Sequence, residues 1–127
     1  MELTESKSSQ QSLYERLGGE VIVRKFVNDV LDKNSNNPLI GHHFQHIDMD
    51  KLKSLVFEFF SMGTGGPHHY TGRDLPASHL HLNISDEDFE IANQDTIQAM
   101  EENGIGQQEQ NEVMAILNSL KGSVVKE

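Results

Sequence analysis

The stretch from residue 63 to residue 82 limits what this chain can fold into more than any other part of the sequence. It contains four glycines and two prolines, so no long helix can run through it, yet it also holds four of the seven histidines. Its last part, residues 75–82, has the pattern of at most a turn or two of helix, with Asp74 as the N-cap and Pro76 in the first turn. This would hold His79 on a short segment among leucines. Haem iron takes such an imidazole on its proximal side, although a histidine of this kind is more often an ordinary core or surface residue.

Helical periodicity dominates the rest of the chain. Apolar residues recur every three or four positions in four segments, which predicts four main helices and an all-α fold, with no strand and no internal repeat. After a short helix at 12–17, the first main helix begins beyond Gly18 and Gly19 and ends at the turn residues 34–38. The other three are expected in these ranges: 49–62, 86 to about 103, and roughly 107–122. Residues 39–47 are expected to be irregular.

The spacing also predicts which faces are buried. The helix at 49–62 has a continuous apolar stripe, with Lys53 and Ser61 among the residues expected to face away from it. The stripe consists of Leu52, Leu55, Val56, Phe59 and Phe60. Asp48 is the expected cap of this helix, and Ser85 opens a capping box for the next one. That next helix should carry an inner face made of Phe89, Ala92, Ile97 and Met100.

Composition sets further limits. The 127 residues suit one domain, and we expect a mobile polar tail at 1–11 followed by a folded domain at 12–127. Hydrophobic residues make up 35% and aromatic residues 6% of the chain, so that a bound apolar cofactor can complete the core. The absence of cysteine excludes disulfides, thiolate haem ligation, Fe–S clusters and cysteine-based zinc sites.

Charge argues against two classes of partner. The formal net charge of −10 disfavours nucleic acid and anionic membrane surfaces. No apolar run approaches the ~18 residues of a membrane span, and the N-terminus lacks a basic-then-apolar signal pattern. We therefore expect a cytoplasmic protein.

Several local sequences together resemble the truncated haemoglobins of group I. They are Leu13-Tyr-Glu-Arg-Leu-Gly-Gly19, Gly65-Gly-Pro67, Tyr70-Thr-Gly-Arg-Asp-Leu-Pro-Ala-Ser-His79 and Ile84-Ser-Asp-Glu-Asp-Phe89, with Phe44 ahead of Asp48-Met49. The resemblance covers about residues 12–122. It implies a 2-over-2 helical sandwich around haem b, in which the glycine pairs allow positive φ angles and tight chain reversals.

The resemblance also implies roles for individual residues. His79 matches the proximal iron ligand, and Phe44 matches the phenylalanine that packs on the haem face. Other positions match residues that contact the haem or line the tunnel for gas ligands: Phe59, Phe60, Leu75, Phe89 and Leu117. Lys53 and Arg73 are candidate partners of the haem propionates, although exposed basic residues need no such role.

The distal side departs from the family pattern. Leu31 stands where the family usually has tyrosine, and Val56 where glutamine is common. Leu52 occupies a position that is glutamine or leucine in the family, and Leu55 one that is often polar or basic. Bound O₂ carries partial negative charge, so losing hydrogen-bond donors costs on the order of 1.5–3 kcal/mol, or roughly ten- to a hundredfold in O₂ retention. The sequence therefore predicts a poor O₂ store that relatively favours CO and NO.

An aliphatic distal side leaves the sixth position of the iron without an evident partner. His46 lies closest to the helix at 49–62 and is the candidate for an internal sixth ligand. The alternative is that all three neighbouring histidines are solvated loop residues: His42, His43 and His46. We expect the remaining ones at the surface, because no cysteine or paired acidic motif accompanies them in a metal site: His68, His69 and His81.

Three functions remain open on the sequence. The first is a haem protein that binds O₂, NO and CO, with conversion of NO to nitrate or a peroxidase-like reaction as side activities; such turnover needs a reductase or electron donor, and no dedicated catalytic motif is present. The second is an electron-transfer or redox- or gas-sensing protein whose iron is held by His79 and His46. The third is a helical bundle without haem. No histidine follows His81, so the covalent haem link to a late helix of some relatives cannot form.

Overall fold

The computed structural model of the protein describes residues 11–72 and 84–125, with Ser123 and Val124 described by their backbone alone. All regular structure in these ranges is helical, which confirms the predicted class. The elements are α2 (Leu13–Leu17), α3 (Gly19–Asn36), the 3-10 helix η1 (Gly41–Phe44), α4 (Met49–Gly63), α6 (Asp86–Glu102), α7 (Gln107–Ser119) and α8 (Lys121–Val124). The four predicted main helices correspond to α3, α4, α6 and α7. Apart from the exposed Gln11, the tail expected at 1–11 lies outside the described residues.

Two helices begin at side chains that the sequence marked as caps, Asp48 of α4 and Ser85 of α6, and Ser12 caps α2 as well. Ser12 and Ser85 both form a complete capping box, in which the serine oxygen accepts from a backbone N–H three residues later and the acidic side chain there accepts in return. Asp48 caps α4 by accepting from the backbone N–H of Lys51 at 3.2 Å. Local polar bonds therefore fix where α2, α4 and α6 start.

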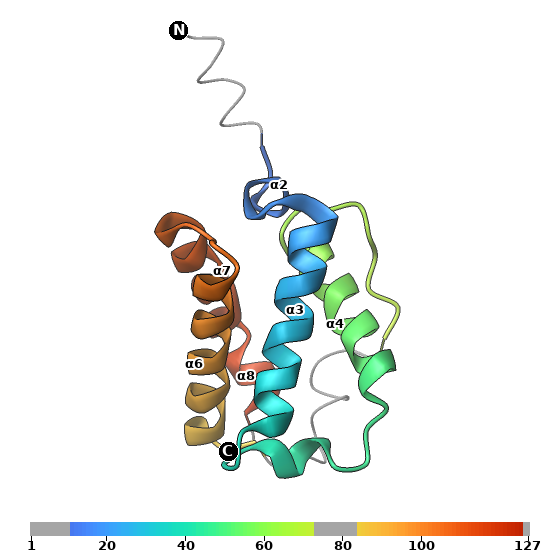
Figure 1. Ribbon diagram of the computed structural model, residues 1–127, viewed down its shortest axis with the longest axis vertical. Helices are drawn as coiled ribbons and strands as arrows, with labels where there is room; N and C mark the ends of the chain where they lie inside the picture. The colour runs from blue at the N-terminus through green and yellow to red at the C-terminus, as the bar shows by residue number, and fades with distance from the viewer. Residues whose placement is uncertain (1–10, 73–83, 126–127) are drawn as a thin grey trace, which may run out of the picture.

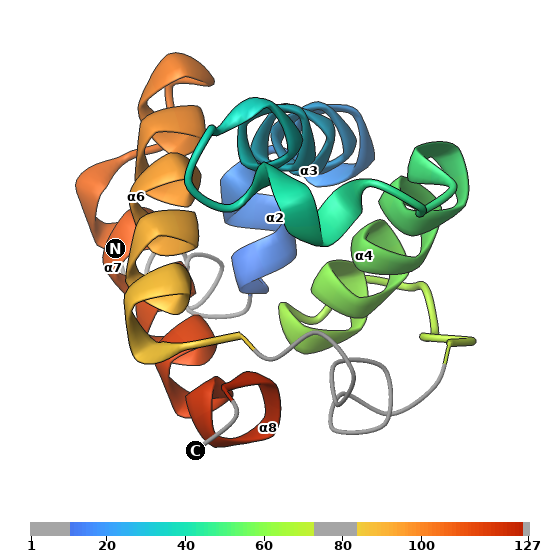
Figure 2. The same ribbon diagram turned by 90° about the horizontal axis from the view of Figure 1, so that it is seen from below.

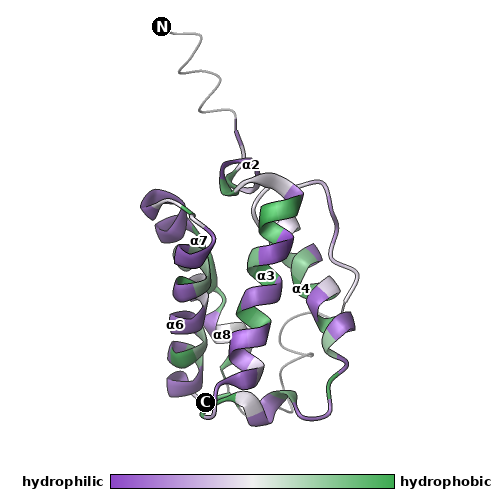
Figure 3. Cartoon of the chain, in the orientation of Figure 1, coloured by the Kyte–Doolittle hydropathy of each residue, from purple (hydrophilic) through white to green (hydrophobic). Residues whose placement is uncertain are grey.

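Helix α3 is the element on which the others assemble. It contacts α4 on one side and α6 on the other, and α7 packs on α6. Figure 1 shows α3 between α6 and α4, and Figure 2 shows the same arrangement from below, with α4 and the α6–α7 pair on different sides of α3. Hydrophobic and hydrophilic residues alternate in bands along α3 (Figure 3), as expected of a helix with a buried face and an exposed one.

The core lies between α3 and its neighbours α4 and α6, and α7 adds Val113 to it. Val23, Phe26 and Val27 of α3 are at most 1% exposed, and Phe57 of α4 is 2% exposed. The edge of the Phe26 ring packs against Phe60, with ring centroids 5.3 Å apart. Close aromatic packing of this kind fixes the distance between α3 and α4, and with it the width of any space that the two helices enclose.

Two faces differ from what the spacing predicts. Ser61, expected to face away from the apolar stripe of α4, is fully buried, whereas Ile97, expected on the inner face of α6, is 36% exposed. Thr96 and Ala99 take the inward positions of α6 instead, because the face that α3 covers is turned by about 100° from Ile97. Residues 39–47 also contain the η1 turn where irregular chain was expected, and the last helix breaks at Leu120 into α7 and α8.

The glycine pair after α4 explains the burial of Ser61. Gly65 has a φ of +89°, which reverses the chain directly after the helix. A Cβ on Gly66 would clash with Ser61 Oγ and would stand 2.7 Å from Cδ1 of Tyr14, so only glycine allows the chain to pass this close. The corner is closed by a hydrogen bond from the backbone N–H of Tyr14 to the carbonyl of Thr64, at 2.9 Å.

None of the helices in the described ranges combines the length and the apolar character that a membrane span requires.

Candidate cofactor-binding site

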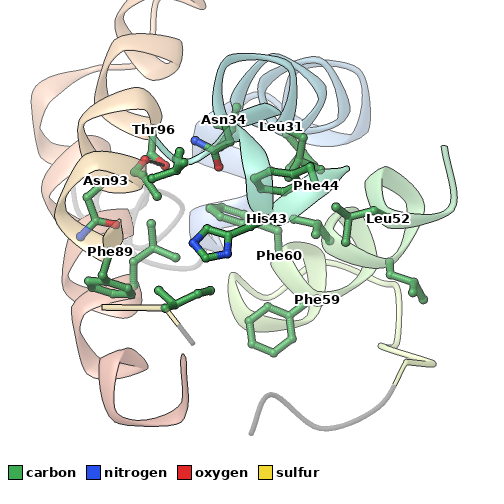
Figure 4. Close-up of a pocket in the computed structure, with 18 of the residues that line it drawn as sticks. Leu31, Asn34, His43, Phe44, Leu52, Phe59, Phe60, Phe89, Asn93 and Thr96 are labelled. Atoms are coloured by element: carbon green, nitrogen blue, oxygen red, sulfur yellow. Dashed lines mark hydrogen bonds between the residues drawn. The ribbon is translucent and has the colours of Figure 1, made fainter. Parts of the chain in front are cut away.

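A cavity of about 500 Å³ lies between the α4 side and the α6 side of the fold, and α3 and η1 line it as well (Figure 4). Most of the residues that line it are apolar. All five residues of the predicted stripe on α4 line it: Leu52, Leu55, Val56, Phe59 and Phe60. The α4 wall of the cavity therefore presents no side-chain hydrogen-bond donor or acceptor.

Four further predicted site residues come from other elements and meet this wall. Leu31 of α3, Phe44 of η1, Phe89 of α6 and Leu117 of α7 all line the cavity. In Figure 4, Phe44, Phe59, Phe60 and Phe89 are drawn around the same space. Residues that are far apart in the sequence thus form one aromatic and aliphatic enclosure.

The remaining predicted site residues either do not line the cavity or lie outside the described residues. Lys53 does not line the cavity; its Nζ lies 2.8 Å from Oδ1 of Asp32, in an ion pair that links α4 to α3. His46 is exposed and is not among the lining residues. Its coordination of iron therefore stays a prediction. Three others lie outside the described residues: Arg73, Leu75 and His79.

His43 is the cavity histidine that the sequence did not single out. Its side chain is 10% exposed, and Nε2 lies 3.0 Å from Oδ2 of Asp88. An ionised carboxylate can only accept, so Nε2 carries the proton in this bond. The exposed ring of His42 lies tilted against it, with the ring centroids 4.1 Å apart. Only the adjacency of His43 to Phe44, and of Asp88 to Phe89, could have pointed to the pair, because both phenylalanines carry a predicted role.

The Asp88 carboxylate is stabilised in its charged form. Burial alone raises its pKa, but hydrogen bonds from the His43 ring and from the backbone N–H of Ser85 more than offset this, so the pKa lies below its usual range. The first turn of α6 is thus fixed at two points, by its own capping box and by η1.

The His43–Asp88 bond belongs to a series of polar contacts that join α3 or its following loop to α6 or its C-cap Asn103, which we call the polar seam. The residue numbers of the contacts rise along one segment and fall along the other, because the two segments are antiparallel. The seam consists of Asp29–Asn103 at 2.9 Å, Lys33–Glu102 at 2.9 Å, Asn34–Asp95 at 3.0 Å, Asn37–Asp95 at 3.2 Å and His43–Asp88 at 3.0 Å. Among its members Asn34, His43 and Asp88 also line the cavity. The α6 side of the enclosure therefore carries polar side chains among its apolar ones, and the α4 side carries none.

The other polar groups that line the cavity on α6 have partners of their own. Thr96 donates to the carbonyl of Ala92 at 3.0 Å, and Asn93 donates to Asn118 of α7 at 3.3 Å. Tyr70 also lines the cavity, with its ring edge against Phe59 at 5.3 Å. These groups support the enclosure through contacts with neighbouring residues.

His68, expected at the surface, is half-buried on the far side of α4. Its ring Nδ1 and its backbone N–H both bond to Ser61 Oγ, at 3.0 and 3.3 Å, and the ring packs on Phe57 at 4.8 Å. His69 is exposed, as expected. His68 thus stabilises the chain reversal at Gly65 and Gly66, away from the cavity.

Comparisons with known proteins agree with this arrangement. A sequence model of the bacterial-like globin family matches residues 12–126. The group 1 truncated haemoglobin GlbN of Mycolicibacterium paratuberculosis is 30% identical over 118 residues, which cover 90% of this chain and 84% of the relative. The group 1 truncated haemoglobin of Tetrahymena pyriformis is 27% identical over 107 residues, which cover 84% and 88%.

Solved structures show the same likeness. The Fe(III) form of the Tetrahymena pyriformis truncated haemoglobin matches with a TM-score of 0.88 at 25% identity, over 92% of this chain and 100% of the other. THB1 of Chlamydomonas reinhardtii matches with a TM-score of 0.79 at 30% identity, over 92% and 98%.

Proposed function

The chain belongs to the bacterial-like globin family and, within it, to the group 1 truncated haemoglobins with their 2-over-2 helical fold, and from this premise we propose that it holds haem b in the cavity between α4 and α6 and binds diatomic gases there. Haem-based gas binding follows from the family in general terms. The type of haem, the residues that hold it and the preferred gas are our proposal.

The residues of the cavity fit a haem. Its volume of about 500 Å³ falls within the range of pockets that enclose small molecules and cofactors. Phenylalanines from η1, α4 and α6 offer flat apolar surfaces to a flat apolar macrocycle. We propose that Phe44, Phe60 and Phe89 hold the ring and that His79 binds the iron, as the resemblance implies. When bound, haem supplies an iron atom with a coordination position for a gas molecule.

The observation that carries the choice of gas is the α4 wall. Each residue that α4 contributes to the cavity is apolar, and so is Leu31, which faces the cavity from α3. Such a wall excludes water and offers no N–H or O–H group to a ligand that carries negative charge. We propose that the protein retains O₂ weakly, roughly ten- to a hundredfold less than a wall with good donors would, and that CO and NO are relatively favoured.

Conversion of NO to nitrate is a less favoured extension of this proposal. It requires bound O₂ to persist until NO arrives, and an electron donor to return the iron to its ferrous state. An α4 wall without donors works against the first requirement. We therefore propose gas binding, rather than turnover with a reductase, as the main role.

An internal sixth ligand remains the alternative proposal. With His46 as the ligand, the ligand-free ferrous protein would have a low-spin spectrum, and a His46→Ala variant would lose it. The exposed position of His46 requires residues 45–48 to move inward before it can do so. We do not give this alternative preference.

The test of the main proposal is an optical spectrum of the purified protein in ferric and ferrous states. We expect a Soret band that a His79→Ala variant loses or shifts strongly, while a His81→Ala variant keeps it. His81 is the matched control because it lies two residues away in the same segment. A wild-type protein that takes up no haem would overturn the proposal.

A further inference from the structure

The last bond of the polar seam differs from the others in where it lies. Both of its members line the cavity, whereas in the Asn34–Asp95 contact only the asparagine does. It is also the link nearest to the start of α6, which follows residue 85. In Figure 4 the His43 ring lies in the cavity, among Phe44, Phe60 and Phe89.

The chain places one cavity phenylalanine directly after each member of this pair. Phe44 follows His43, and Phe89 follows Asp88. Phe44 lies in η1 and Phe89 in α6, so a bond that holds η1 against the first turn of α6 also fixes the separation of the backbone positions that carry the two phenylalanines. One hydrogen bond between η1 and α6 therefore restricts both phenylalanines at once.

The surroundings make this bond a strong one. The two side chains are 10% and 21% exposed, and the acceptor is a carboxylate. Asp88 cannot readily turn to a different partner, because it also closes the capping box with Ser85. Loss of the His43 donor would leave a carboxylate facing an apolar cavity without its side-chain partner, which is the costly half of breaking a hydrogen bond.

We propose that His43 and Asp88 are positioning residues for haem retention: their hydrogen bond fixes Phe44 and Phe89 in the cavity wall, and breaking it speeds the loss of haem without changing the ligands of the iron. The proposal rests on the haem site proposed above. It predicts the rate of haem loss, and it assigns the pair no contact with the bound gas.

The experiment measures the rate at which haem leaves the holoprotein for an excess of a haem-free scavenger globin. His43→Phe keeps a ring but removes the donor, and we expect haem loss to be about tenfold faster. His43→Gln keeps an N–H group that can reach Asp88 and should restore a rate close to that of the wild type. His42→Phe is the matched control, because it makes the same change at an exposed neighbouring ring and keeps the ring contact with His43, so that the rate should be unchanged.

A double-mutant cycle separates a coupled pair from two independent packing effects. Asp88→Leu alone loses the acceptor, but the double variant with His43→Phe leaves no unpartnered charge. We therefore expect the double variant to lose haem more slowly than the product of the two single effects predicts. Purely additive effects, or an unchanged rate in His43→Phe, would overturn the proposal.

The spectrum of the ligand-free ferrous protein is recorded for the same variants. It should be the same in wild type and in His43→Phe. A change from six- to five-coordinate iron would show that His43 is itself a ligand and would overturn a positioning role. If the wild type binds no haem, the proposed function fails; if it binds haem and His43→Phe releases it at the same rate, only this inference fails.

Discussion

The α4 wall and the α6 wall of the cavity are built on opposite principles. Leu52, Leu55 and Val56 on α4 enclose space and offer no polar atom, whereas α6 brings Asp88, Asn93 and Thr96 to the same cavity. The α6 side is joined to α3 and η1 by the polar seam, and the α4 side packs on α3 through ring contacts such as Phe26–Phe60, beside the Lys53–Asp32 ion pair. The two walls therefore have different roles. The α4 wall determines the polarity of the surface that a ligand meets, and the α6 wall, through its hydrogen bonds, fixes the position of the surrounding helices.

The largest expected effect is a difference in stability between substitutions on the two faces of α4. Phe57 points into the core at 2% exposure, with the Arg24 guanidinium 4.0 Å from its ring centre, while Phe59 is half-buried and faces the cavity. We expect Phe57→Ala to lower the free energy of unfolding by about 3–5 kcal/mol. Phe59→Ala should lower it less in the haem-free protein, because the ring already borders empty space. Urea denaturation followed by circular dichroism measures both, and equal losses would contradict a cavity-facing role for Phe59.

The second prediction puts a donor into the apolar wall. Leu31 is 6% exposed and lines the cavity. A Leu31→Tyr variant should slow O₂ dissociation by roughly ten- to a hundredfold, since its hydroxyl can donate to bound O₂. Leu31→Phe is the control, because it adds a ring of similar size without the hydroxyl. Stopped-flow mixing of the ferrous oxygen complex with CO gives the rate, and similar rates in the two variants would show that size rather than hydrogen bonding limits O₂ retention.

The third prediction removes a link of the polar seam. Asn34 is 6% exposed and donates to Asp95, so Asp95→Ala leaves a buried amide without its acceptor. The free energy of unfolding should fall by about 1–3 kcal/mol. Asp32→Ala is the matched control, because its ion pair with Lys53 lies at the surface and should contribute at most about 1 kcal/mol. The reverse order in a denaturant series would contradict a structural role for the seam.

The smallest effect concerns an ion-pair cluster remote from both walls. Arg16 bonds to Glu112 at 2.7 Å and to Glu109 at 3.1 Å, joining α2 to α7. The hydrogen bond from Arg16 lowers the pKa of Glu112 below its usual range. A lowered folded-state pKa means that this stabilisation is complete above the unfolded value of about 4.3 and is lost as the pH falls through the folded value.

Arg16→Met should therefore lower the melting temperature at pH 7 more than at pH 3. Thermal melts of the two proteins across this range measure the difference. A gap between wild type and variant that does not change with pH would contradict the contribution of the ion pairs.

The sequence predicted the residues that line the cavity better than it predicted the contacts that join its walls to the rest of the fold. Helical spacing alone identified the stripe from Leu52 to Phe60, because one buried face of a helix repeats every three to four residues. The same spacing missed Ser61, whose burial depends on the close approach that Gly66 allows. It also misplaced Ile97, because hydropathy cannot tell which of two adjacent positions on α6 faces α3.

The histidines show a second limit. His43 and His46 are three residues apart, and locally only the adjacency of His43 to Phe44 distinguishes them. The 3-10 turn of η1 places His43 in the cavity and His46 in solvent, and the partner that fixes His43 lies 45 residues further along the chain. Long-range polar pairs of this kind follow from tertiary structure and leave no periodic signal in one sequence.

The most direct test of the account is the O₂ dissociation rate of the wild-type ferrous protein. An α4 wall without donors predicts fast dissociation, roughly ten- to a hundredfold faster than from a group 1 truncated haemoglobin with a distal tyrosine, measured under the same conditions. A slow rate, comparable to that of such a relative, would show that a donor reaches the bound gas and would contradict the central claim.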